Sequence, residues 1–272
     1  MGFDFLTDEH LALYGRFRGD PSPQQFHDFF HLDEEQLKRI AELRHPHTKL
    51  GFALQLTTLK FLGTFLSDPL AVPDSVIRTL AVQLQLPRSI QLHRYLDRRE
   101  TRFNHQTEIR KMLGYKDFDA VEVLHLMRFL YAHLLVTDER PIELFDRLTQ
   151  RLIQRHVILP GPTVLAQIVV RVRERVMTRL HRQITARLDA NQTDTLAEVL
   201  VVPEKQRRSR LDVLRTPPTR QKSPGLIQAL KRIEDIRALG VGKIKLDDIP
   251  QARIRVLSRQ GLTAWSGHLA QM

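Results

Sequence analysis

Apolar residues recur every three or four positions along most of the chain, which is the period of an amphipathic α-helix. Strict alternation of apolar and polar residues, the pattern of a half-buried strand, is nearly absent. The longest periodic segment runs over 163–188. Beside its apolar face, Arg171, Arg175 and Arg182 fall within about 40° of one another around a helix axis. Such a row is either a ridge that follows phosphates or the solvated side of a core helix. The pattern predicts an all-α, multi-helical protein.

Capping residues and helix breakers set the expected bounds of the helices. Asp119 is an expected N-cap. Asp74 is expected to begin a helix that Pro87 ends. Gly114 and Gly240 suit the left-handed residue that follows a helix C-terminus. The expected helices cover residues 75–86, 107–113, 120–135, 163–188, 226–239 and 250–258.

The same pattern divides the chain into four parts. The segment 203–225 is rich in proline, has little periodicity and carries a net charge of +5, so it is expected to be a basic linker that follows phosphates without rigid geometry. The expected parts are an N-terminal helical DNA-binding module over 1–150, a long amphipathic helix region over 151–202, this linker, and a small helical C-terminal segment over 226–272.

The net charge of +11 is unevenly distributed. Residues 1–150 carry a net charge of −2 and residues 151–272 carry +13. This asymmetry indicates a polyanionic partner, nucleic acid before membrane, although a merely solvated basic surface is the alternative. Most of the excess positive charge comes from arginine, which favours bidentate contact with phosphate.

The absence of cysteine excludes disulfides, thiolate metal sites and a cysteine nucleophile. It suits a reducing cytoplasm. No secretion signal is expected in the first residues, and no apolar stretch reaches the ~18 residues that a membrane span needs. The sequence predicts a cytoplasmic protein without a membrane partner.

Two segments have the outline of a helix-turn-helix, over 76–95 with a break at Pro87 and over 107–129 with a break at Gly114. In the first, Leu92 and Tyr95 are expected to point inward. Any all-α domain offers helix pairs, so this pattern alone indicates DNA binding only weakly.

The stretch 98–118 mixes cations with planar side chains at an expected helix start, as contact with phosphates and base edges requires. Arg102 and Arg110 flank the expected start at Thr107, and His105 is expected either to cap that helix or to donate to a base edge. In the competing interpretation, Glu108 or Asp97 holds these arginines in ion pairs. The candidate DNA-binding residues are Arg94, Arg98, Arg99, Arg102, His105, Arg110, Lys111, Lys116, Arg207, Arg208 and Arg210.

Histidine pairs are the only candidates for a metal site. His27 and His31 lie four residues apart, and His45 and His47 flank Pro46, but no carboxylate or thiolate completes a zinc signature. A nuclease with two metals needs acids on separate elements, usually strands, which this chain does not offer. No metal, cofactor or catalytic residue is predicted.

Six segments of the chain resemble, in order, the N-terminal region of the cointegrate-forming replicative transposases of the Tn3 family. They are spread over nearly the whole chain. The most specific strings are Leu50-Gly51-Phe52-Ala53 and the run from Thr101 to Arg110. The segments are residues 5–17, 47–65, 72–84, 98–115, 157–165 and 249–262.

The resemblance implies an all-helical region whose modules recognise the terminal inverted repeats of a transposon. In the family, catalysis belongs to a later ribonuclease-H-like domain with three metal-binding acids, and no such acid triad occurs in this sequence. The expected function is therefore recognition of transposon ends in duplex DNA, without catalysis. The expected protein partners are a second copy or a full-length transposase. The alternatives are a non-catalytic regulator of transposition and a truncated remnant.

Overall fold

The structure is a computed structural model that describes residues 5–87, 90–204, 206–216 and 223–264. Its helices, with η marking 3-10 helices, are α1 (Asp8–Leu13), α2 (Pro23–Phe29), α3 (Glu34–Ala41), α4 (Pro46–Leu62), α5 (Asp74–Gln83), η1 (Leu92–Leu96), α6 (Arg99–Met112), α7 (Ala120–Val136), α8 (Pro141–Gln154), α9 (Pro162–Thr185), α10 (Ala190–Leu200), α11 (Arg210–Arg215), α12 (Ser223–Ala238), η2 (Val241–Lys243) and α13 (Gln251–Thr263). Within the described residues, β-type pairing is limited to a single bridge between Lys116 and Val157. The predicted all-α fold class is confirmed.

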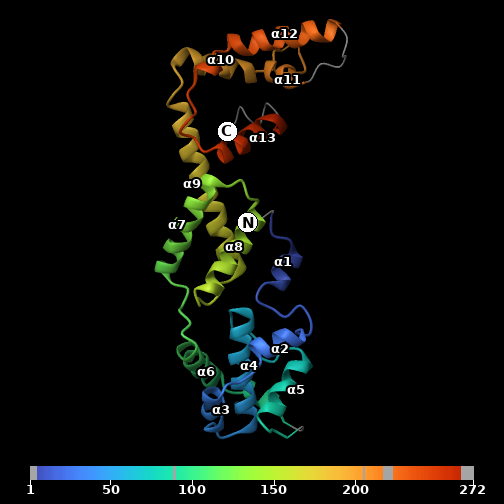
Figure 1. Cartoon of the computed structure of the whole chain (residues 1–272), viewed down its shortest axis with the longest axis vertical. Helices are drawn as coiled ribbons and strands as arrows, with labels where there is room; N and C mark the ends of the chain where they lie inside the picture. The colour runs from blue at the N-terminus through green and yellow to red at the C-terminus, as the bar shows by residue number, and fades with distance from the viewer. Residues whose placement is uncertain (1–4, 88–89, 205, 217–222, 265–272) are drawn as a thin grey trace. The chain divides into compact units, whose positions relative to one another are not determined.

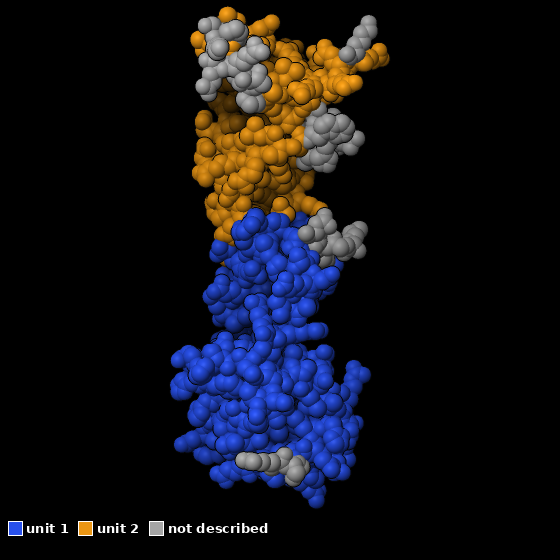
Figure 2. Space-filling view, turned by 90° about the vertical axis from the view of Figure 1, so that its right-hand side faces the viewer, with its two compact units in different colours: residues 1–127, 140–170 blue, residues 128–139, 171–272 orange. Residues whose placement is uncertain are grey.

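The chain forms two compact units, shown in different colours in Figure 2. Unit 1 comprises Met1–Met127 and Arg140–Val170, and unit 2 comprises Arg128–Glu139 and Arg171–Met272. Helices α7 and α9 each contribute residues to both units. The two units are described separately below.

Helix α4 is the centre of unit 1. Every residue from Leu50 to Leu59 is buried, and α2, α3, α5, α6 and η1 all pack against this helix (Figure 1). A helix that is mainly apolar and buried on all sides needs such a complete cover of neighbours. Gly63 ends α4 in the left-handed conformation at φ 73°, and its carbonyl accepts a hydrogen bond of 2.9 Å from Leu159 N.

Helix α8 adds an amphipathic layer to unit 1. Its buried residues Leu144, Leu148 and Leu152 recur every four positions and form one apolar face. Phe145 joins them and contacts Tyr14, with ring centroids 5.4 Å apart. The segment between α1 and α2 is thereby tied to residues far along the chain.

Guanidinium groups join the elements of unit 2. Arg187 donates to Asp248 Oδ2 at 2.5 Å, which links the end of α9 to the segment before α13. Arg253 of α13 is 5 % exposed and donates to the carbonyl of Thr137, just after α7. The apolar contribution of α9 to this unit comes from Val172, Val176 and Leu180.

Most expected helices are present within a few residues of their predicted ends. Asp119 Oδ1 accepts hydrogen bonds from the backbone N–H groups of Val121 and Glu122, as expected of an N-cap. Gly114 and Gly240 are left-handed, at φ 66° and 68°. No described helix is long and apolar enough to cross a membrane.

Two segments differ from their expected form. The helix expected over 107–113 begins eight residues earlier, at Arg99. The segment expected to be a linker contains helix α11, whose N-cap Ser209 forms a reciprocal capping box with Asp212. Residues 205 and 217–222 of that segment lie outside the described residues.

Candidate nucleic-acid interface

The early start of α6 changes the setting of the candidate residues in unit 1. Arg98 is the N-cap, and Glu100 in the first turn complements the helix dipole. Arg102 and His105 therefore lie inside the helix, and the expectation that free N–H groups at Thr107 lie between Arg102 and Arg110 is wrong. The reason is that His105 and Ile109, four residues apart, lie on the same buried face of α6. Burial of His105 on this face extends the helix toward its N-terminus.

The inner face of α6 is anchored by a buried polar network. His105 is 6 % exposed and its Nδ1 lies 2.9 Å from Tyr95 Oη, which also receives a hydrogen bond from Gln55 Nε2. Burial lowers the pKa of the His105 imidazole. His105 thus does not cap a helix, which corrects that expectation, and its buried side chain joins α6 to η1 and α4.

The outer face of α6 and η1 carries exposed cations. Among the described residues, no hydrogen bond or ion pair is formed by the side chains of Arg94, Arg98, Arg99, Lys111 and Lys116, all exposed. Phe103, one of the planar side chains of the stretch 98–118, is 66 % exposed. At 3.6 residues per turn, Phe103 lies within about 40° of Arg99 around the helix. An exposed aromatic ring therefore lies one helical turn from an unpaired arginine on this face of α6.

Arg102 and Arg110 are less accessible than the other candidate cations. Arg102 is half-buried, and its Nε is buried without a hydrogen-bond partner among the described residues. Arg110 forms an ion pair with Asp117. Glu108 does not hold these arginines, because its Oε2 accepts a hydrogen bond of 2.9 Å from Arg39 instead. Within the part of the chain that the structure describes, Asp97 forms no ion pair with either arginine. Ion pairing was correctly anticipated for Arg110, but with a different partner.

The expected helix-turn-helix outlines are only partly present. Tyr95 is buried as expected, yet the second helix of the outline over 76–95 is the five-residue 3-10 helix η1. The first helix of the outline over 107–129 is α6, which packs on α4 and η1. Gln85, at φ 51°, and the following Pro87 interrupt the chain after α5, which favours a short 3-10 turn over a second α-helix.

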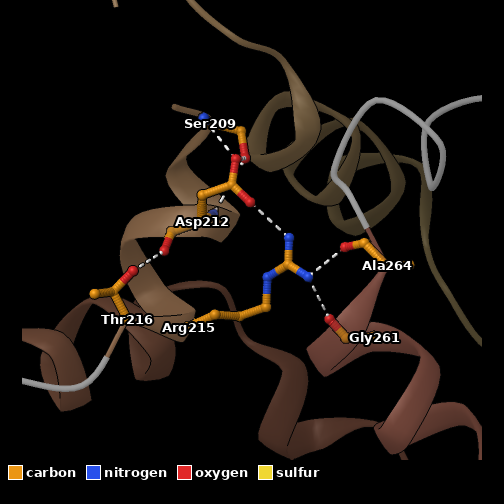
Figure 3. Close-up of polar contacts among 6 residues, drawn as sticks. All are labelled: Ser209, Asp212, Arg215, Thr216, Gly261 and Ala264. Carbon is orange, nitrogen blue, oxygen red and sulfur yellow. Dashed lines mark hydrogen bonds and ion pairs between the residues drawn. The ribbon is translucent and has the colours of Figure 1, made fainter. Parts of the chain in front are cut away.

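The second group of candidate cations lies in unit 2, around the start of α11. Arg207, Arg208 and Arg210 are exposed, and Arg210 lies 3.7 Å from a carboxylate oxygen of Asp235. Arg207 and Arg208 come just before α11 and Arg210 is its first residue, and hydrogen bonds join this helix to the end of α13 (Figure 3). Arg215 donates to the carbonyls of Gly261 and Ala264 at 2.8 and 2.6 Å, and to Asp212 at 2.6 Å. These cations therefore extend from a fixed support.

The histidine pairs are stacked rings. The ring centroids of His27 and His31 lie 6.5 Å apart, and those of His45 and His47 lie 5.3 Å apart. Across the described ranges, no group of three or more His, Cys, Asp or Glu side chains could hold a metal ion.

Comparison with known proteins gives the family. Residues 5–172 match the family model DUF4158, described as a domain of unknown function, and the chain belongs to this family. The candidate cations of unit 1 all lie within the matched residues.

Several curated transposases are similar to the chain. The transposase for transposon gamma-delta of Escherichia coli (strain K12) is 37 % identical over 273 residues, covering 100 % of this chain and 27 % of that protein. The transposase for transposon Tn1546 of Enterococcus faecium is 26 % identical over 86 % of this chain and 24 % of its own length. The transposase for transposon Tn2501 of Escherichia coli is 28 % identical over 88 % of this chain and 24 % of its own length.

These matches confirm the predicted resemblance to the N-terminal region of Tn3-family transposases. The chain spans about a quarter of the length of the curated relatives it matches.

Proposed function

We propose that this chain is the DNA-binding part of a replicative transposase and that it recognises the terminal inverted repeats of a transposon. The observation that carries the proposal is the outer face of η1 and α6, where the exposed ring of Phe103 lies one helical turn from the unpaired Arg99 and further unpaired cations flank the helix at both ends. Whole-chain similarity to transposases supports the same conclusion. Unpaired arginines supply phosphate contacts, and an exposed aromatic ring supplies apolar contact with a base.

The outer cations and Phe103 have different roles in this proposal. Arg94, Arg98 and Arg99 bind phosphates beside the N-terminus of α6, whose free backbone N–H groups also favour an anion. Phe103, one turn further along, contacts a base edge such as a thymine methyl group. Lys111 and Lys116 extend the phosphate contacts beyond the other end of the helix.

The inner residues support this face. His105 positions α6 through Tyr95 rather than contacting DNA. Arg102 and Arg110 remain candidate contacts at the edge of the face, and the ion pair with Asp117 limits the freedom of Arg110. In unit 2, Arg207, Arg208 and Arg210 contact the DNA backbone without reading sequence.

We further propose that the chain carries no strand-transfer activity and acts on DNA in the cytoplasm. The chain is similar to curated transposases over about a quarter of their length, and end recognition is the role proposed for this part. Its partner in this role is double-stranded DNA, with a second copy or a full-length transposase as further candidates.

Selection from a pool of random duplexes tests the proposal. The full chain is expected to enrich one sequence, and that sequence is expected to resemble transposon terminal repeats, such as those of transposon gamma-delta. Matched selections with Arg99→Gln and with Phe103→Ala are expected to enrich it less. Recovery of unrelated sequences from the wild-type selection would overturn the proposal.

A further inference from the structure

A row of four arginines runs along the part of α9 that belongs to unit 2. Arg171, Arg175, Arg179 and Arg182 are all exposed. At 3.6 residues per turn and 1.5 Å rise per residue, they lie within about 80° around the helix and extend for roughly 16 Å along it. The only acid of the helix, Glu174, lies about 95° away from the centre of this row.

None of these four arginines forms an ion pair with a described carboxylate. Other arginines of unit 2 do have such partners, including Arg187 with Asp248 and Arg215 with Asp212. Like charges three or four residues apart destabilise a helix. The four arginines form three successive pairs of like-charged neighbours, which are unfavourable unless an external anion is bound along the row.

The support of this row is rigid enough to present a fixed pattern of charge. On the adjacent face, Val172, Val176 and Leu180 are buried and hold the helix in unit 2. Arg179 donates to Tyr131 Oη at 2.8 Å, and its guanidinium carbon lies 5.9 Å from the centre of that ring. This contact orients one guanidinium of the row before any ligand binds.

We infer that the arginine row of α9 is a further DNA-binding surface, which contacts successive phosphates and reads no bases. A duplex offers one phosphate per strand about every 3.4 Å along its axis, so a row of roughly 16 Å faces several of them. The planar guanidinium suits bidentate contact with phosphate oxygens. The inference rests on the proposed function and adds the face of α9 to the sequence-independent contacts proposed for Arg207, Arg208 and Arg210 in unit 2.

The test is a fourfold variant of the full chain, Arg171→Gln, Arg175→Gln, Arg179→Gln and Arg182→Gln. Glutamine removes the charge and retains good helix propensity, so circular dichroism should show an unchanged helix content. Each lost phosphate contact lowers the slope of log K against log salt by about 0.9, so the slope should become less steep by about 3 to 4. Affinity at fixed salt should fall roughly 10-fold or more, equally for the selected and scrambled duplexes.

Two further variants complete the test. The control replaces four exposed cations elsewhere in unit 2 and lowers the net charge by the same amount: Lys231→Gln, Arg237→Gln, Lys243→Gln and Arg255→Gln. It should change the slope by less than half as much. A fourfold Arg→Lys variant of the row keeps the charge and should keep most of the slope.

The outcomes separate this inference from the proposed function. An unchanged slope in the Gln variant, while the wild type still prefers its selected duplex, overturns the inference alone and leaves an acidic protein surface as the partner of the row. If the slope becomes less steep by the same amount in the control variant, the change depends only on net charge, and the inference is again overturned. A wild-type chain that binds no duplex overturns both proposals.

Discussion

The ring of Tyr95 lies directly against Gly51, so that a Cβ atom on Gly51 would come within 2.4 Å of ring carbon atoms. Both residues are buried, Gly51 in the middle of α4 and Tyr95 in η1. A glycine in the middle of a helix weakens it relative to alanine, so its presence here has a packing reason. The close approach allows Tyr95 to reach Gln55 and His105, which explains the glycine in the Leu-Gly-Phe-Ala string of α4.

Gly51→Ala is therefore expected to destabilise unit 1, because the Tyr95 ring must move away from α4. Overpacking of this kind costs about 1–3 kcal/mol, and each kcal/mol lowers the melting temperature by roughly 2–4 °C in a unit of this size. Gly161→Ala is the matched control, since the nearest atom to its added Cβ is Thr163 Oγ1 at 4.0 Å. Equal melting temperatures for the two variants would contradict this account of the packing.

The stability of unit 1 should depend on the protonation of His105. Burial lowers the pKa of its imidazole, while Glu108 opposes the shift and Arg39 adds to it. The unfolded chain then binds this proton at a higher pH than the folded chain does. The free energy of unfolding should therefore fall as the pH drops below about 6.5 toward the folded-state pKa.

Urea unfolding between about pH 7 and pH 5 measures this dependence. His105→Gln should flatten it, and His93→Gln, at an exposed histidine in η1, should leave it unchanged. Some dependence should survive in His105→Gln, because burial also lowers the pKa of His47. An identical pH dependence in the wild type and His105→Gln would show that this imidazole is not buried in its neutral form.

The ion pair of Arg110 with Asp117 provides a test of whether Arg110 contacts DNA. Asp117→Asn releases the guanidinium and should raise DNA affinity about two- to fivefold, the equivalent of up to about 1 kcal/mol for an exposed pair. Binding is measured by fluorescence anisotropy. Asp97→Asn controls for the removal of one acid nearby, because Asp97 is exposed and in no ion pair with a described residue. If Arg110→Gln melts at a lower temperature but binds DNA like the wild type, Arg110 is a structural residue.

Arg215 is expected to control the order of α11. Its guanidinium joins that helix to the carbonyls at the end of α13, and Arg215→Gln removes these hydrogen bonds (Figure 3). Amide hydrogen exchange should become faster in α11 and the last turn of α13, and remain unchanged in α4. Arg255→Gln, at an exposed position of α13, should leave all exchange rates unchanged. If the amide exchange rates of α11 in Arg215→Gln equal those of the wild type, contacts other than those of Arg215 hold α11.

Local signals were sufficient to predict the fold class and most helix ends. The N-cap Asp119 and the left-handed glycines Gly114 and Gly240 act within a few residues of the ends they define. The capping box of α11 was also local, because Ser209 and Asp212 have the required spacing, but the surrounding prolines and charges favoured a linker.

The character of α6 depended on distant residues and was not predictable from local pattern. His105 is buried because Tyr95 and Gln55, from η1 and α4, form its hydrogen-bond network. Glu108 is bound by Arg39 of α3, which lies 69 positions earlier in the chain. Partners at such separations are set by packing, and periodicity around residue 105 does not reveal them. The roles of the exposed cations remain predictions, because they depend on a DNA partner.

The most direct test of the central claim is the ratio of the dissociation constants for scrambled and selected duplexes, measured at one salt concentration. The wild-type chain is expected to prefer the selected duplex by a factor of about 10³ or more, as specific DNA-binding proteins do. The double variant Arg99→Gln with Phe103→Ala should reduce this ratio by roughly 10-fold or more, since a lost base contact costs about 1–3 kcal/mol. A ratio near one for the wild type, or an unchanged ratio in the double variant, would contradict the account.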